Sequence, residues 1–177
     1  FTLILFSYSN FVYSNPKNAI AEDQKTVNIL NNYFSRQIIV GKANFQFLFW
    51  NMYDAKLISE SGSYPSDKFA LILKYNKDFS KKSVVDETIN QLKKQKSFNE
   101  KELKEVNVLL DKAFREIKKN NKFIGIKNND KAIFYFQNEK VLETANSEFI
   151  KIFFDIWLRK NSQNPKFTQE LLGKTKG

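Results

Sequence analysis

The stretch FQFLFWNMYDAKLI, residues 45–58, decides how the rest of the chain is interpreted. In Phe45–Trp50 every residue except Gln46 is apolar, so both faces of an extended segment would be apolar. A strand of this kind is typical of the centre of a sheet. We therefore predict one long central strand here. Because the run is long, we also predict a β-bulge near Asn51–Asp54.

A second aromatic stretch, FFDIWL at Phe153–Leu158, lies near the other end of the chain. The two stretches together resemble the bacterial branch of the chalcone isomerase-like family. In that branch an aromatic strand runs into Trp/Phe-x-x-Tyr-Asp-Ala-x-Leu, here Trp50–Leu57, and a late helix closes on Phe-Phe-x-Ile-Trp-Leu. The resemblance covers most of residues 36–173. It implies an open-faced sandwich, in which helices pack on one face of a mainly antiparallel sheet.

The order of the expected elements leads to the same fold class. Strands, two helices, further strands and a helix follow one another with short connections, which is typical of an α+β domain. We expect strands at 37–40, ended by Gly41, and at 69–75, 123–126, 132–137 and 140–143. We expect helices that begin at Ser80 or Ser83 and at a Ser97-x-x-Glu100 capping box, a helix at 147–159 capped by Asn146, and one turn at 168–172.

The first residues have the pattern of a secretory signal. Phe1–Val12 is mostly apolar, and the small-residue triplet Ala19–Ala21 precedes the polar Glu22. A buried strand or helix, or an uncleaved anchor, is the alternative. We expect residues 1–21 to be a signal peptide and residues 22–177 to be a single exported domain, located in the periplasm.

The chain contains no Cys and no His, and this excludes several classes of site. Disulfides, zinc sites built from Cys and His, Cys nucleophiles and triads with a His base are all ruled out. A lipid-modified Cys at the cleavage point is ruled out as well. We expect no metal and no cofactor.

The aromatic motif has a structural and a functional interpretation. In the structural one, Trp50 and Tyr53 fill the core, and Asp54 accepts backbone hydrogen bonds at a bend. In the functional one, Trp50 and Tyr53 wall an apolar pocket between sheet and helices, where small apolar ligands normally lie. The candidate ligand-binding residues are Leu48, Trp50, Tyr53 and Lys56.

Catalysis is the second possibility that the resemblance raises. The plant isomerases of the superfamily close a chalcone to a flavanone, with a strand Arg at the developing oxyanion and Thr and Tyr groups that organise water and substrate. Arg36 can be placed opposite that Arg only with a favourable choice of gaps, and alignment on Gly41–Ala43 places Phe45 there instead. Leu48 stands where the family has Thr. The catalytic candidates are Arg36 and Tyr53.

The formal net charge of +10 is carried by lysines that often occur in pairs, at 81 and 82, 93 and 94, and 118 and 119. Such pairs indicate a basic outer surface, most simply the solvated face of a helix. Weak attraction to an anionic membrane surface follows from charge alone. A specific nucleic-acid partner is not expected, because the chain lacks an Arg cluster and a stacking platform.

Taken together, the sequence favours an exported chalcone isomerase-like domain that is not catalytic. It would bind a small apolar or amphipathic molecule, such as a fatty acid. An intramolecular lyase-type isomerase, with Arg36 or a lysine as electrophile and Tyr53 as donor, is one alternative. A protein that binds partners through its basic surface is another. A cation in a cavity beside Trp50 and Tyr53 would favour the isomerase. The sequence carries no signal for oligomeric state.

Cleavage of the predicted signal peptide is testable. The exported product should begin at Glu22, because Ala19 and Ala21 fit the small-residue preference of a signal peptidase. N-terminal sequencing of the periplasmic protein would check this. A product that keeps Phe1–Ala21, or that stays in the cytoplasm, would contradict the prediction.

Overall fold

The computed structural model describes residues 23–174, so the predicted signal peptide at 1–21 lies outside the described residues. A single six-stranded sheet has the order β1-β2-β3-β4-β5-β6, and every neighbouring pair is antiparallel. The strands are β1 Ile38–Phe47, β2 Trp50–Ser59, β3 Lys68–Tyr75, β4 Lys122–Asn128, β5 Lys131–Phe136 and β6 Glu139–Thr144. The helices are α1 Gln24–Asn31, α2 Lys81–Lys93, α3 Glu100–Ala113, α4 Ser147–Leu158 and α5 Pro165–Leu171.

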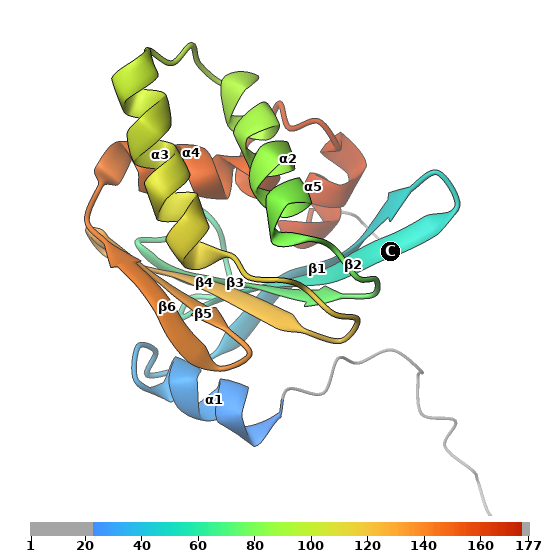
Figure 1. Cartoon of the computed structure of the whole chain (residues 1–177). Coiled ribbons are helices and arrows are strands. Elements are labelled where there is room, and N and C mark those ends of the chain that lie inside the picture. Colours follow the sequence, from blue (N-terminus) through green and yellow to red (C-terminus); the bar gives the residue numbers. More distant parts are fainter. Residues whose placement is uncertain (1–22, 175–177) are drawn as a thin grey trace, which may run out of the picture.

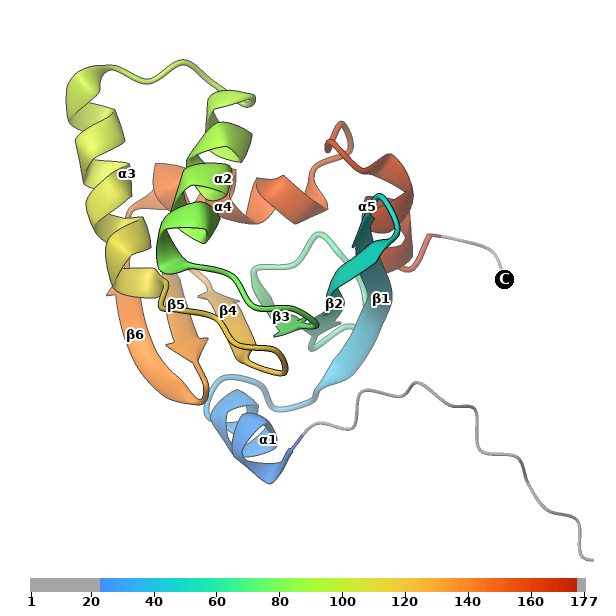
Figure 2. The ribbon, with the colours of Figure 1, turned by 45° about the vertical axis from the view of Figure 1, so that its right-hand side comes forward.

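The helices form a layer on one face of the sheet, as the predicted α+β open-faced sandwich requires. Figure 1 shows α2, α3 and α4 across this face, with α1 on the opposite side. After a turn of the molecule, α5 is seen beside β1 at the edge of the sheet (Figure 2). The expected fold class is therefore confirmed.

Aromatic side chains fill the space between α4 and the sheet. Phe153 is fully buried, and its ring lies 5.1 Å from that of Phe134 on β5, centroid to centroid. Asn146 caps α4 as predicted, because its side chain accepts the backbone N–H of Phe149 at 2.9 Å. The side chain of Trp157, in the last turn of α4, is 8% exposed. The late aromatic motif is thus mainly a core motif.

Helix α1 covers part of the other face, which the sequence did not predict. Leu30 and Phe34 pack there against five apolar side chains of the sheet, namely Ile58, Ala70, Ile72, Ile124 and Ile126. The N-cap Asp23 accepts the N–H of Thr26 and also pairs with Lys122 of β4 at 2.5 Å. The hydrogen bond from Lys122 is the main reason that the pKa of Asp23 falls to about 2. The helix is therefore attached by both apolar and charged contacts.

The predicted central strand at residues 45–58 is wrong. The chain turns back at Leu48 and Phe49, so this stretch forms a hairpin of β1 and β2, and β1 is an edge strand. The turn was missed because it lacks the Asn, Asp or Gly residues that usually mark a two-residue turn. The predicted bulge is confirmed, since Phe45 pairs with Tyr53 and Gln46 with Asn51.

Gly41 does not end the first strand, contrary to expectation. It lies within β1, where the carboxyl end of α5 packs directly on the strand. A Cβ atom at Gly41 would lie 2.5 Å from the carbonyl oxygen of Leu171, and closer still to that of Glu170. The glycine is needed for this close approach rather than as a strand terminator.

The predicted start of α2 is confirmed and that of α3 is displaced. Ser80 caps α2, but the capping box of α3 is formed by Asn99 and Glu102 rather than by Ser97 and Glu100. The apolar repeat also continues past the end of α3. Ile117, which continues the apolar spacing of Val106, Leu110 and Ala113, lies beyond α3 and pairs in an isolated bridge with Phe79.

Replacement of Gly41 by Ala should destabilise the protein by about 1–3 kcal/mol, the usual cost of inserting a methylene into a tight contact. The contact is with backbone carbonyls of α5, which cannot rotate away as a side chain would. Urea denaturation would measure the change. Lys42→Ala, an exposed site on the same strand, is the control and should have little effect. Equal unfolding midpoints for Gly41→Ala and wild type would contradict the packing described here.

Candidate functional site

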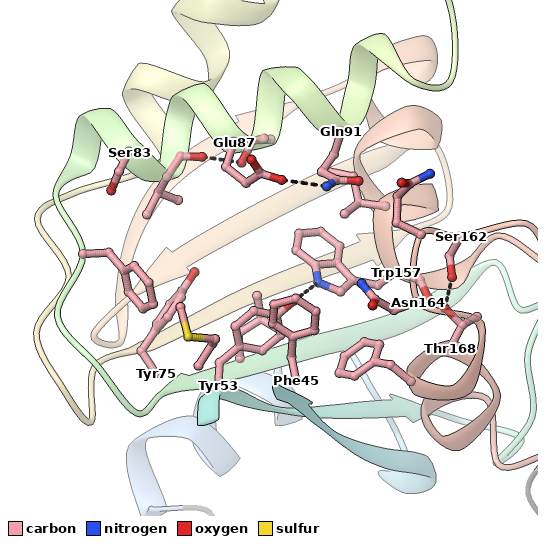
Figure 3. Close-up of a pocket in the computed structure, with 18 of the residues that line it drawn as sticks. Phe45, Tyr53, Tyr75, Ser83, Glu87, Gln91, Trp157, Ser162, Asn164 and Thr168 are labelled. Atoms are coloured by element: carbon pink, nitrogen blue, oxygen red, sulfur yellow. Dashed lines mark hydrogen bonds between the residues drawn. The ribbon is translucent and has the colours of Figure 1, made fainter. Parts of the chain in front are cut away.

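A cavity of about 320 Å³ lies between the helix layer and the β1–β3 part of the sheet. Figure 3 shows that Phe45, Tyr53 and Tyr75 reach it from the strands, while Trp157 reaches it from α4. The residues that line it are Phe45, Met52, Tyr53, Leu73, Tyr75, Phe79, Ser83, Val84, Glu87, Thr88, Gln91, Phe114, Ile156, Trp157, Ser162, Gln163, Asn164, Phe167 and Thr168.

The mouth of the cavity lies between α2 and the connection of α4 to α5. The exposed residues of the lining, Ser83, Glu87, Gln163 and Asn164, all come from these two segments. Glu87 is the one charged residue of the lining, and its carboxylate accepts a hydrogen bond from the side-chain amide of Gln91 at 2.6 Å. No Lys or Arg is among the described residues that line the cavity.

Tyr53 connects the sheet to α4 at the floor of the cavity. Its hydroxyl oxygen accepts a hydrogen bond from the indole N–H of Trp157 at 3.0 Å (Figure 3). Its ring stacks on Phe45, with the centroids 4.9 Å apart. Burial raises the pKa of Tyr53, because a phenolate would lose its hydration there. Tyr53 therefore remains a neutral phenol with a hydroxyl proton to donate.

Tyr75 is a second phenol in the cavity wall. Its ring centroid lies 6.0 Å from that of Tyr53, and the side chain is 5% exposed. Burial raises the pKa of Tyr75 as well. The aromatic wall thus carries two hydroxyl groups that stay protonated at any physiological pH.

Two hydroxyl groups fix the wall formed by the start of α5. Thr168 donates its proton to the backbone carbonyl of Trp157 at 2.8 Å. Ser162 must then donate to the hydroxyl of Thr168, 2.6 Å away, because a hydroxyl has only one proton. Both side chains are buried. These bonds hold the α4–α5 connection against the cavity and leave neither proton free for a ligand.

Of the residues predicted from sequence, only Tyr53 lines this cavity. Leu48 and Trp50 lie at the tip of the β1–β2 hairpin, 75% and 57% exposed, so the expectation that Trp50 walls the pocket is wrong. Lys56 is buried, but its side chain lies on the face of the sheet that α1 covers. In the strand register it is opposite Ile72 of β3, which lies on that same face. Arg36 is exposed in the segment between α1 and β1. The hairpin turn exposes Leu48 and Trp50, whereas the alternation of side chains along β2 directs Lys56 to the face opposite Tyr53.

Asp54 has a structural role that differs from the predicted one. Its carboxylate accepts side-chain amide protons from Asn44 at 2.5 Å and from Asn76 at 3.0 Å, rather than backbone N–H groups at a bend. Asn51 accepts from the same two amides. This cluster joins β1, β2 and the residue after β3 at the point where the hairpin extends beyond β3.

Several cavity residues had no functional signal in the sequence. Tyr75 and Phe79 belong to a strand end and a loop, and Glu87 and Gln91 belong to α2. Trp157 is both buried and part of the lining. The cavity can offer two phenol donors to a polar atom of a ligand, but no cation.

A solved structure of a fatty-acid binding protein from Arabidopsis thaliana is similar to this chain, with a TM-score of 0.60 over 78% of this chain and 88% of that one. The fold is chalcone isomerase-like. The identity is 13%, so this likeness establishes the chalcone isomerase-like fold alone. No protein-family model matches the sequence. No curated protein matches it either. Assignment to the bacterial branch of the chalcone isomerase-like family stays a prediction.

Within residues 23–174, none of the helices is both long enough and apolar enough to cross a bilayer. Within the same range, no group of three or more acidic side chains is arranged to hold a metal ion. The cavity beside Tyr53 is therefore the strongest candidate for a functional site in the described part of the chain.

The two tryptophans should respond in opposite ways to truncation. Trp157→Ala should cost about 3–5 kcal/mol, because a buried indole is lost and Tyr53 loses its partner. Trp50→Ala, the matched control, should change stability by at most about 1 kcal/mol, the worth of an exposed cation–π contact. Urea midpoints of the two variants would test this. A midpoint for Trp157→Ala that equals the wild-type value would exclude its packing role.

Proposed function

We propose that this domain binds a small apolar or amphipathic molecule in the cavity beside Tyr53 and does not transform it. The observation that carries the proposal is an aromatic cavity whose described lining contains no cation. Its volume of about 320 Å³ is near the lower end of small-molecule sites, which run from about 300 to 1,000 Å³. A compact ligand, or the medium-length chain of an amphipathic one, suits this space.

A fatty acid is one candidate, since the chain shares its fold with a protein named for fatty-acid binding. The hydrocarbon tail would contact Phe45, Leu73 and Phe167, which would remove apolar surface from water. The charged head group of a fatty acid fits the cavity less well than the tail does. A carboxylate would meet no Lys or Arg in the described lining, and Glu87 at the mouth would repel it.

A neutral oxygen matches the cavity better than a carboxylate. Tyr53 and Tyr75 remain protonated and can donate hydrogen bonds to an alcohol, an ester carbonyl or a protonated acid. These bonds would orient the head group, while the tail supplies most of the binding energy. We therefore propose a neutral amphipathic molecule with a medium-length chain as the best-fitting ligand.

The isomerase alternative receives less support. Oxyanion stabilisation needs a cation or donors aimed at the developing charge, and the candidate Arg36 is exposed on the segment before β1 rather than in the cavity. Leu48, in the position of the family Thr, is at the hairpin tip. The phenol of Tyr53 alone is a hydrogen-bond donor without the partner groups that the resemblance implies.

Binding of partners through lysine faces also receives less support. Lys81 lies 2.6 Å from Asp111 and Lys82 lies 2.5 Å from Asp86, so part of this charge is paired locally on the helices. Solvated helix faces with local ion pairs explain such lysines. Export to the periplasm remains part of our proposal, and it rests on the sequence of residues 1–21.

A thermal-shift series with matched chain lengths would test the proposal. Decanol should raise the melting temperature at least as much as decanoic acid at neutral pH, because the cavity lacks a cation. A ligand at one hundred times its dissociation constant adds about 2.7 kcal/mol to the free energy of unfolding, which a melting scan detects. Arg36→Ala should leave both shifts unchanged, because Arg36 lies outside the lining.

Two valine variants provide the controls. Val84→Trp should fill the cavity and abolish the decanol shift, since Val84 lines it from α2. Val108→Trp places the same side chain at an exposed site on α3 and should keep the shift. A shift that survives Val84→Trp would place the ligand elsewhere. Cyclisation of a chalcone that disappears in Arg36→Ala would overturn the proposal in favour of the isomerase.

A further inference from the structure

The tip of the β1–β2 hairpin exposes four large apolar side chains in a row. The exposed fractions are 59% for Phe47, 75% for Leu48, 99% for Phe49 and 57% for Trp50. They account for most of the exposed large apolar residues in the described part of the chain. A contiguous apolar patch of this kind marks a binding surface for a membrane or another protein.

The hairpin extends away from the rest of the molecule. Figure 1 shows the β1–β2 turn beyond the ends of the neighbouring strands, outside the layers of sheet and helices. The backbone of Leu48 has a φ of +54°, an unfavourable conformation for a bulky residue. Residues such as Asn and Gly form such turns more easily and would not expose apolar surface. The residues at the tip therefore do not favour the stability of the folded protein by itself.

Basic groups lie directly beside the aromatic tip. The ammonium group of Lys77 is 3.3 Å from the centre of the Trp50 ring, and Lys119 lines the same shallow hollow. Asp78, the acidic residue of that hollow, pairs with Lys118 at 3.2 Å and accepts the backbone N–H of Lys119. The hollow beside Trp50 is therefore basic on balance, which suits an anionic partner.

We propose that the hairpin tip, Phe47–Trp50, inserts into the surface of an anionic phospholipid bilayer. Apolar side chains would enter the boundary between head groups and acyl chains, and Trp50 would lie at the head-group level that indole side chains prefer. Lys77 and Lys119 would contact lipid phosphates. Charge complementarity favours this occupant over a second copy of the chain, which has the same net charge of +10.

The same hairpin also contributes to the cavity. Phe45 and Met52 lie two residues from either end of the tip, and both line the cavity. A bilayer that holds the tip would thus lie close to the site proposed for an amphipathic ligand. Membrane docking does not depend on that site being occupied, so the two proposals can fail separately.

Co-sedimentation of the proposed exported product, residues 22–177, with vesicles would test the docking. Wild-type protein should bind vesicles of phosphatidylcholine and phosphatidylglycerol, and bind pure phosphatidylcholine more weakly. The double variant Leu48→Ser/Phe49→Ser should lose at least tenfold in affinity, while Val108→Ser, which also removes an exposed apolar side chain, should not. Lys77→Gln/Lys119→Gln should weaken only the anionic binding, and added salt should do the same.

The tryptophans offer a second readout. In Trp157→Phe, Trp50 is the one remaining tryptophan of the chain, and its emission should shift to shorter wavelength when anionic vesicles are added. A melting scan of each variant would verify folding. Vesicle binding that persists in the double tip variant would arise from another surface of the domain and would overturn the proposal. A wild-type dimer that the tip variant converts to monomers, without vesicle binding, would also overturn it.

Discussion

The packing of Phe153 is the interaction on which the rest of the fold depends. Its fully buried ring lies within 6.4 Å of six other aromatic rings, measured between centroids, and these rings come from α4, β4, β5 and the end of α3. Removing large apolar rings from water is the main source of stability in such a layer. Because α4 is anchored at this point, its last turn and the connection to α5 have defined positions over β1–β3.

The cavity begins where the aromatic packing around Phe153 ends. Trp157 lies 5.4 Å from Phe153, between centroids, and its N–H is bound to Tyr53, so the indole is fixed at the border between core and cavity. Beyond the indole, the hydroxyl of Ser162 is hydrogen-bonded to that of Thr168, which donates to the backbone carbonyl of Trp157. Polar groups that are fully paired can line an apolar space without a desolvation penalty. What remains for a ligand is mainly aromatic and aliphatic surface, two phenols, and the side-chain amides of Gln163 and Asn164 at the mouth.

The β1–β2 hairpin serves two purposes that require different chemistry. Where the hairpin extends beyond β3, Asp54 and three asparagines connect the strands by hydrogen bonds, and Phe45 contributes to the cavity. At its tip, Phe47–Trp50 face solvent, although such side chains are normally buried. A sequence pattern records only that a residue is apolar. It cannot distinguish an apolar side chain that is buried in the core from one that is exposed at the surface. For this reason the stretch was predicted as a central strand.

The sequence by itself determined the fold class, the strands from Phe69 to Glu143, and the caps at Ser80 and Asn146, because these depend on periodicity and on local hydrogen bonds. The tertiary structure alone decided the edge position of β1, the packing of Gly41 under α5 and the covering of the far face by α1. It also decided which candidates meet: Tyr53 joins Tyr75 and Trp157, whereas Arg36, Leu48, Trp50 and Lys56 lie elsewhere. The physical reason is that a cavity is formed by segments far apart in the chain. A turn at Leu48 and Phe49, where one continuous strand was predicted, placed Leu48 and Trp50 at an exposed tip.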